Sequence, residues 1–133
     1  ERLLKEGHMV EFAPKGVSMR PFIEGGRDKV VLKACNEPQV GMIVLARINQ
    51  AFVLHRIYKI RGKKIILQGD GNLTGQEVCK DEDIIGRVVR VKGKYGKRKR
   101  LTRGRLWRHM PLLLKKLVLK VYRICILLTD YED

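Results

Sequence analysis

Three polar side chains in this sequence have types and settings suited to acyl chemistry. Ser18 lies in "GVSMRPF", His55 follows the apolar run "FVL", and Asp70 lies in "GDGN". A serine hydroxyl attacks a carbonyl only when a nearby base removes its proton. Histidine supplies a base near neutral pH, and a carboxylate can orient the imidazole and stabilise its cation. The order Ser18, His55, Asp70 therefore permits a Ser–His–Asp arrangement built from distant parts of the chain.

Each of these residues also has an ordinary structural interpretation. A serine between Gly and Pro is typical of a turn, and an aspartate between glycines is typical of an Asx-turn. A histidine in an apolar run often packs on a strand without chemistry. Residue types alone leave these alternatives open for Ser18, His55 and Asp70, so the surrounding elements have to decide between them.

Up to residue 95 the sequence is a succession of short apolar runs separated by turns, which is typical of strands. Strands are expected at 8–14, 29–35, 42–48, 51–60, 65–68 and 84–93. The pair Asn49–Gln50 separates two of these runs and predicts a hairpin, although Asn-Gln is a weaker turn signal than Asn-Gly. The pattern predicts a mainly β fold, a coiled antiparallel sheet or partly open barrel.

After Gly104 the spacing of the apolar residues becomes helical. Apolar side chains stand at 106, 110, 113, 117, 121, 124 and 128, and Lys116, Lys120 and Arg123 recur on another side of the same helix. Pro111 either starts this helix or kinks it. The expected organisation is a β-domain over 1–95 that carries the candidate site, a basic linker over 96–104, and an amphipathic helix with a tail over 105–133.

The charge of the chain favours an anionic partner. The net charge is +15, from 29 Lys and Arg against 14 Asp and Glu, and much of the excess lies in 90–109. Such an excess suits nucleic acid or an anionic membrane. Aromatic residues are only 6% of the sequence and no recognition-helix motif is evident, so nucleic acid is the less favoured partner.

The segment 97–123 is the candidate membrane surface. Alternatively, the helix packs its apolar face on its own domain or on a partner subunit. The oligomeric state stays open.

Cysteine, histidine and glycine spacing argues against disulfides and cofactors. Cys35, Cys79 and Cys125 are odd in number and widely spaced, so we expect free thiols, as in a reducing compartment. His8 and His109 lack partners at metal-ligand spacing, and no phosphate-binding glycine motif occurs, so neither a metal nor an organic cofactor is expected.

The sequence has no uncharged apolar run of about 18 residues and no recognisable signal peptide. We expect a cytoplasmic or peripherally membrane-associated protein, and whether an anchor precedes Glu1 stays open.

Four segments together resemble a known superfamily. "GVSMRPFIEGGRDKVVL" resembles the Ser-x-Met-x-Pro box of the signal peptidase and LexA-like superfamily of serine peptidases. "FVLHRIYKI" resembles the His-Arg box of its archaeal and endoplasmic-reticulum branch, "LQGDGN" resembles that branch's Gly-Asp-Asn-Asn box, and "DIIGRVV" its closing strand. The resemblance covers about residues 8–92, with the boxes in the family's order.

This resemblance implies a serine endopeptidase that cleaves a precursor or a signal-peptide-like substrate. Ser18 would attack the scissile carbonyl, and its main-chain N–H would stabilise the oxyanion. His55 would take the proton, at the place where bacterial signal peptidases and LexA-type repressors use Lys. Asp70 would orient His55, and Met19 and Pro21 would shape the loop and the adjacent substrate cleft. The substrate would be a peptide or protein bound as an extended strand, and no cofactor would be required.

The sequence departs from the family pattern at two places. Arg27 is inserted in "GGRDKVV", between the glycines and the aspartate that precedes the next strand. Three acidic residues are candidates for the second acidic residue of the branch, and none matches its position fully: Glu77, Asp81 and Asp83.

The alternative function is a non-catalytic module of the same fold, which binds an anionic membrane or nucleic acid through its basic C-terminal region.

Overall fold

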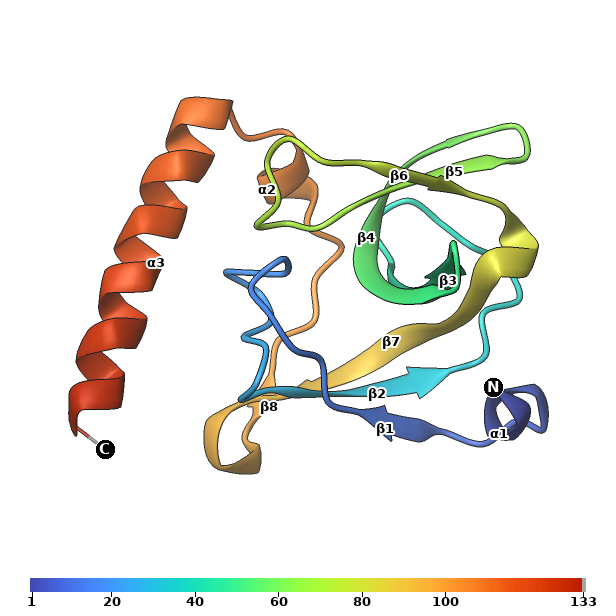
Figure 1. Ribbon diagram of the computed structural model, residues 1–133, viewed down its shortest axis with the longest axis horizontal. Helices are drawn as coiled ribbons and strands as arrows, with labels where there is room; N and C mark the ends of the chain where they lie inside the picture. Colours follow the sequence, from blue (N-terminus) through green and yellow to red (C-terminus); the bar gives the residue numbers. More distant parts are fainter. Residues whose placement is uncertain (133) are drawn as a thin grey trace.

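The strands lie in one strongly curved antiparallel sheet, and a long helix stands at one side of the molecule (Figure 1). The computed structural model describes residues 1–132, with side chains described up to Thr129. The strands are β1 (Val10–Phe12), β2 (Lys29–Lys33), β3 (Ile43–Ile48), β4 (Ala51–Arg61), β5 (Lys64–Gln68), β6 (Glu77–Cys79), β7 (Ile84–Lys92) and β8 (Arg98–Lys99). The helices are α1 (Arg2–Lys5), α2 (Arg105–Arg108) and α3 (Leu112–Glu132), with short 3₁₀ turns η1 (Asp81–Asp83) and η2 (Lys94–Gly96).

The order of strands in the sheet is β1-β2-β7-β3-β4-β5-β6, with β8 added to β7. Every neighbouring pair is antiparallel. Register shifts between Val31 and Leu32, Leu45 and Ala46, and Ile57 and Lys59 increase the local twist and bend the strands. The prediction of a mainly β fold with a curled antiparallel sheet and a C-terminal helix is confirmed.

The hairpin that carries His55 forms where the sequence predicts it. Residues 43–48 of β3 pair with residues 51–56 of β4, and Ile48 lies opposite Ala51. Asn49 and Gln50 have φ values of 50° and 67°, the left-handed pair that a tight two-residue hairpin turn requires. Asparagine tolerates this region better than most residues with a side chain. The turn therefore fixes the register that brings His55 to its place on β4.

The curved sheet has apolar side chains packed on both faces. Alternate residues of β3 point to opposite sides: Ile43 and Leu45 join one core cluster, and Val44 and Ala46 join the other. Met19 and Ile23, from the loop that carries Ser18, insert into the first cluster. These two side chains anchor the loop to the sheet. The cysteines of the described chain are free thiols, as expected.

The segment expected to be a basic linker, 96–104, is instead part of the folded unit. Residues 98–99 pair with β7 as β8. Arg56 Nη1 donates to the Thr102 carbonyl at 2.8 Å. A Cβ on Gly104 would stand 2.7 Å from the Arg56 guanidinium carbon, so only glycine lets the chain pass this closely. Contacts with Arg56, a residue of the sheet itself, hold the segment in place.

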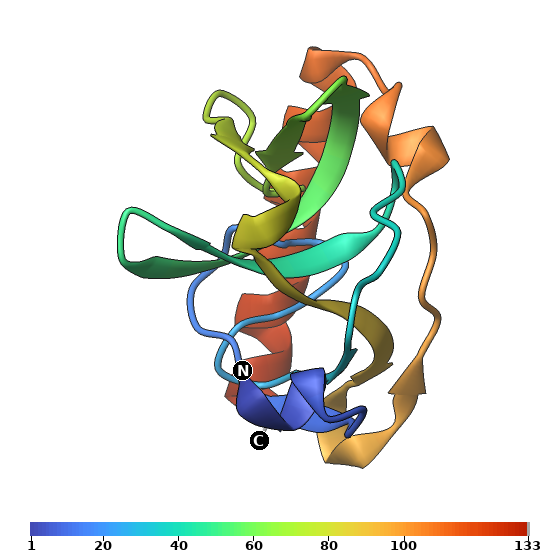
Figure 2. The same cartoon turned by 90° about the vertical axis from the view of Figure 1, so that its right-hand side faces the viewer.

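Helix α3 begins directly after Pro111, which therefore starts the helix and does not kink it. The Lys115 N–H donates to the Pro111 carbonyl at 3.0 Å, which closes the first turn. The helix forms one edge of the molecule in Figure 1 and lies behind the sheet in Figure 2. No helix among the described residues combines the length and apolarity that crossing a membrane requires.

Candidate active site

Ser18 and His55 line the same cleft, which has a volume of about 470 Å³. Ser18 comes from the loop between β1 and β2, and His55 comes from β4. The cleft is lined by Phe12, Ala13, Pro14, Lys15, Gly16, Ser18, Met19, Ile23, Gly25, Leu45, Phe52, Val53, Leu54 and His55. Two of the three predicted catalytic residues, far apart in sequence, are therefore brought to one concave surface.

The "GDGN" loop sits directly against the Ser18 loop. The Gly71 N–H donates to the Ser18 carbonyl at 2.8 Å. A Cβ on Gly69 would stand 2.4 Å from the Ser18 carbonyl oxygen and 3.0 Å from His55 Nε2. No side chain fits there, so glycine at 69 lets the Ser18 main chain and the imidazole edge lie next to each other. The Ser18 carbonyl oxygen and His55 Nε2 therefore both lie against Gly69.

The carboxylate at the other side of the imidazole belongs to Glu77, at the start of β6. His55 Nδ1 lies 3.1 Å from both Oε1 and Oε2 of Glu77. The His55 side chain is 9% exposed and that of Glu77 27%. When Nδ1–H donates to a carboxylate, the neutral ring carries its lone pair on Nε2. With Nδ1–H donating to Glu77, Nε2, the nitrogen that lies against Gly69, is the acceptor.

Asp70 is paired with Arg56 in the interior, and no hydrogen bond or ion pair between the described Asp70 and His55 side chains is present. Arg56 Nε lies 3.0 and 2.9 Å from the two carboxylate oxygens, and Nη2 lies 2.9 Å from Oδ2. The Tyr58 hydroxyl donates to Oδ1 at 2.9 Å. Burial and the neighbouring Asp70 carboxylate raise the pKa of Tyr58. The expectation that Asp70 lies beside His55 is wrong: Asp70 pairs with Arg56, and the carboxylate at His55 Nδ1 is that of Glu77.

Strand geometry explains why Asp70 does not lie beside His55. His55 and Arg56 are consecutive on β4, so their side chains point to opposite faces of the sheet. Asp70 follows Gly69 and points to the Arg56 side. There its carbonyl also accepts a hydrogen bond from Trp107 Nε1 at 2.9 Å. Asp70 thus holds the interior behind the cleft and does not line the cleft.

Met19 and Pro21 were expected to shape the loop and the cleft. Met19 does both, since it is buried in the core and lines the cleft. Pro21 is half-buried and follows a cis peptide bond; among the described residues, it is not part of the cleft lining. Its contribution is therefore to the path of the loop.

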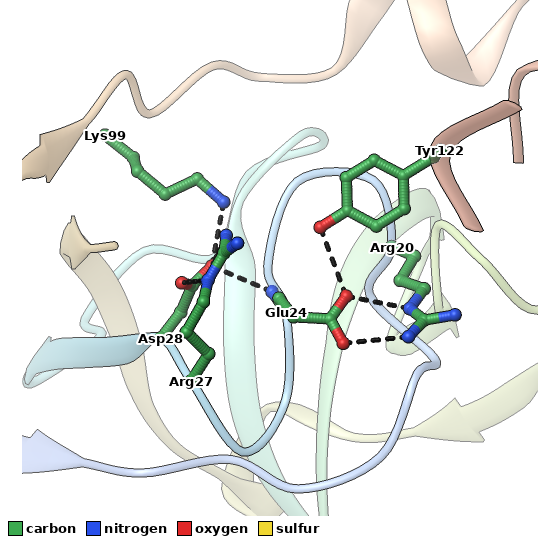
Figure 3. Close-up of polar contacts among 6 residues, drawn as sticks. All are labelled: Arg20, Glu24, Arg27, Asp28, Lys99 and Tyr122. Atoms are coloured by element: carbon green, nitrogen blue, oxygen red, sulfur yellow. Dashed lines mark hydrogen bonds and ion pairs between the residues drawn. The ribbon is translucent and has the colours of Figure 1, made fainter. Parts of the chain in front are cut away.

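The inserted Arg27 is accommodated by folding back onto Asp28 (Figure 3). Its Nε donates to Asp28 Oδ1 at 2.8 Å, and the Glu24 N–H and Lys99 Nζ each donate to Oδ2 at 2.8 Å. Burial alone would raise the pKa of Asp28, but these donors hold it below its ordinary value. Asp28 therefore still closes the loop at the start of β2, and the insertion leaves the Ser18 loop anchored.

Within the described part of the chain, no group of three or more His, Cys, Asp or Glu side chains is placed to hold a metal ion. Among the described residues, the polar side chains that line the cleft are those of Ser18, His55 and Lys15, and the Glu77 carboxylate lies behind the His55 ring. Such a set can transfer a proton from a hydroxyl to an imidazole that a carboxylate stabilises.

Comparison with known proteins agrees with this architecture. The family model described as Peptidase S24-like matches residues 3–89, which include β1 to β6 and most of β7. No curated protein matches the chain. The family match supports the resemblance to the LexA-like and signal-peptidase-like superfamily. It covers the Ser18 loop, His55 and Glu77, and more than half of the sequence. The chain therefore belongs to the Peptidase S24-like family.

Proposed function

We propose that this protein is a serine endopeptidase in which Ser18 is the nucleophile, His55 the general base and Glu77 the acid that orients the base. The observation that carries the proposal is the His55–Glu77 pair at Nδ1, in a cleft that Ser18 also lines, with Nε2 and the Ser18 carbonyl both lying against Gly69. Membership in a peptidase family supports it. A non-catalytic binding module on the same fold gives no role to a carboxylate at Nδ1, so it is less favoured.

In the proposed reaction, these groups act in turn. As Ser18 Oγ forms a bond to the scissile carbonyl carbon, His55 Nε2 takes the hydroxyl proton and Glu77 stabilises the imidazolium. The peptide C–N bond then breaks, the proton passes from Nε2 to the leaving amine, and an acyl-enzyme remains. Water attacks the ester with His55 again acting as base, which releases the carboxylic acid and restores Ser18.

The Ser18 main-chain N–H is the proposed oxyanion donor. In the described chain the Ser18 carbonyl is held by Gly71, and no main-chain acceptor is assigned to the Ser18 N–H. An unpaired N–H beside the attacking oxygen is suited to a developing negative charge.

The lining of the cleft supports a peptide substrate with apolar side chains. Leu45, Phe52, Val53 and Leu54 contribute to it from the β3–β4 hairpin, and Phe52 is largely exposed. We propose an extended segment of a precursor or signal-peptide-like protein as the substrate. We propose that the enzyme is most similar to the archaeal and endoplasmic-reticulum branch of signal peptidases; a histidine as base, and the sequence boxes that resemble those of that branch, support this proposal.

The substitution Glu77→Gln tests the proposed function. It keeps the size of the side chain but removes the charge that fixes the tautomer of His55, so we expect the cleavage rate to fall by about 10⁴-fold. The measurement is mass spectrometry of new peptide termini in a peptide library digested by the wild type and the variant. Glu82→Gln is the matched control, since Glu82 is an exposed glutamate on η1. Equal loss in both variants, or unchanged cleavage by Glu77→Gln, would refute the role of Glu77.

A further inference from the structure

Helix α3 turns its continuous apolar stripe away from the protein. The stripe consists of Leu113, Leu117, Val121, Ile124 and Leu128, which stand at helical spacing and are all exposed. The face toward the domain is formed by other residues: Lys115 is buried, and Val118, Leu119, Tyr122 and Ile126 are half-buried. The exposed set from Leu113 to Leu128 is called the outer stripe below. The apolar face predicted from the sequence is thus not the face that packs on the β-domain.

Polar contacts hold the helix in this orientation. The Tyr122 hydroxyl donates to Glu24 Oε1 at 3.1 Å, and Arg20 binds both oxygens of Glu24 at 2.8 and 2.9 Å (Figure 3). One turn from the start of the helix, Lys115 Nζ lies 5.7 Å from the ring centre of Tyr58 and 5.9 Å from that of Trp107. Rotating the outer stripe inward would break both sets of contacts. The outer stripe therefore stays available to a partner.

Cations border the outer stripe along the helix. Lys116, Lys120 and Arg123 are exposed on one flank, and no ion pair is assigned to them among the described side chains. The chain as a whole carries a net charge of +15. Two copies facing each other through this surface would bring like charges together, which opposes self-association. The charge instead complements a surface that is both apolar and anionic.

We propose that the outer stripe of α3 docks on an anionic lipid membrane, with the helix lying in the interface. An apolar stripe flanked by lysine and arginine is the arrangement that binds at the boundary between headgroups and acyl chains. Each cation near an anionic bilayer adds electrostatic attraction, while the leucine and isoleucine side chains enter the acyl boundary. Because Tyr122 joins α3 to Glu24 and Arg20, docking holds the Ser18 loop beside the helix that lies on the membrane.

Vesicle binding by the full chain tests this proposal without any substrate. We expect co-sedimentation with phosphatidylcholine vesicles that contain phosphatidylglycerol, little binding to phosphatidylcholine alone, and weaker binding as salt is raised. Leu117→Gln combined with Ile124→Gln should lower the partition coefficient by about tenfold or more, as expected when two apolar side chains no longer enter the acyl boundary. Replacing Lys116, Lys120 and Arg123 by Gln should lower it by roughly fivefold for each cation.

The matched control is Leu3→Gln combined with Met9→Gln. Leu3 and Met9 are 48% and 61% exposed, close to the 48% and 56% of Ile124 and Leu117, and α1 lies at the other end of the molecule from α3 (Figure 1). This control should bind as the wild type does. Equal binding to both kinds of vesicle, no binding at all, or the same loss in the control would overturn the proposal. A dimer in sedimentation velocity that the Leu117/Ile124 variant abolishes would overturn it in favour of a second copy.

Discussion

Replacing Ser18 by alanine lowers the cleavage rate by about 10⁶-fold, the loss typical of a missing nucleophile in a serine peptidase. Without the hydroxyl, His55 has no proton to accept and no acyl-enzyme forms. Ser18 lies half-buried on a loop anchored by Met19 and Ile23, so removing one oxygen leaves the packing in place. The measurement compares new termini from a peptide library digested by the wild type and by Ser18→Ala.

The control for this substitution removes a hydroxyl elsewhere. Thr74→Ala changes an exposed side chain in the segment between β5 and β6, and we expect wild-type cleavage from it. The thermal midpoint of Ser18→Ala should match that of the wild type. Cleavage by Ser18→Ala at the wild-type rate would show that another group, or another protein, is responsible.

Replacing Asp70 by alanine destabilises the fold by about 3–5 kcal/mol, the loss expected when one partner of a buried ion pair is removed. The Arg56 and Asp70 side chains are both fully buried. Without Asp70, the guanidinium keeps its hydrogen bonds to the carbonyls of Gly41 and Thr102 but loses its counter-charge. The Tyr58 hydroxyl loses its acceptor as well. Urea unfolding followed by circular dichroism measures the difference in free energy of unfolding.

A surface aspartate supplies the comparison for Asp70. Asp81→Ala removes an exposed carboxylate from η1, and its free energy of unfolding should stay within about 0.5 kcal/mol of the wild type. Glu77→Gln should also keep the wild-type stability, since Glu77 is partly exposed. If Asp70→Ala were as stable as Asp81→Ala, the Arg56–Asp70 pair would not hold the interior as described.

The strands and the hairpin could be predicted because their signals are local. Apolar runs bounded by turn residues identified β2, β3, β4, β5 and β7, and Asn49–Gln50 identified the hairpin turn. Strand β6 has three residues and no alternation long enough to read, so Glu77 had no predicted position. It was one of three candidate acids, and only the sheet order β4-β5-β6 brings it to His55.

Glu77, and not Asp70, lies beside His55, which shows that a sequence motif can place a loop without determining the direction of its side chains. The glycine–aspartate box does bring its loop to Ser18, through Gly69 and Gly71. The direction of the Asp70 side chain depends on the alternation between His55 and Arg56 on the neighbouring strand. A buried arginine needs a counter-charge, and this requirement takes Asp70 away from the cleft.

The orientation of α3 could not be read from hydropathy. The apolar spacing identified the helix and its outer stripe, and left open whether the stripe packs on the domain, on a partner or on a membrane. The contacts that orient the helix come from Tyr122 and Lys115, through a hydrogen bond and cation–π contacts. Both are contacts of polar side chains, and the spacing of apolar residues gives no information about such contacts.

Labelling with a fluorophosphonate probe tests the central claim most directly, since it needs no knowledge of the substrate. An activated serine oxygen displaces fluoride from phosphorus, and its proton passes to the base. Ser18 is the only serine in the sequence, so peptide mapping by mass spectrometry assigns a serine adduct without ambiguity. We predict one phosphonyl group on Ser18 of the folded protein, and a strongly slowed reaction in His55→Ala. A folded wild-type protein that stays unlabelled at Ser18, or reacts no faster than His55→Ala, would contradict the account.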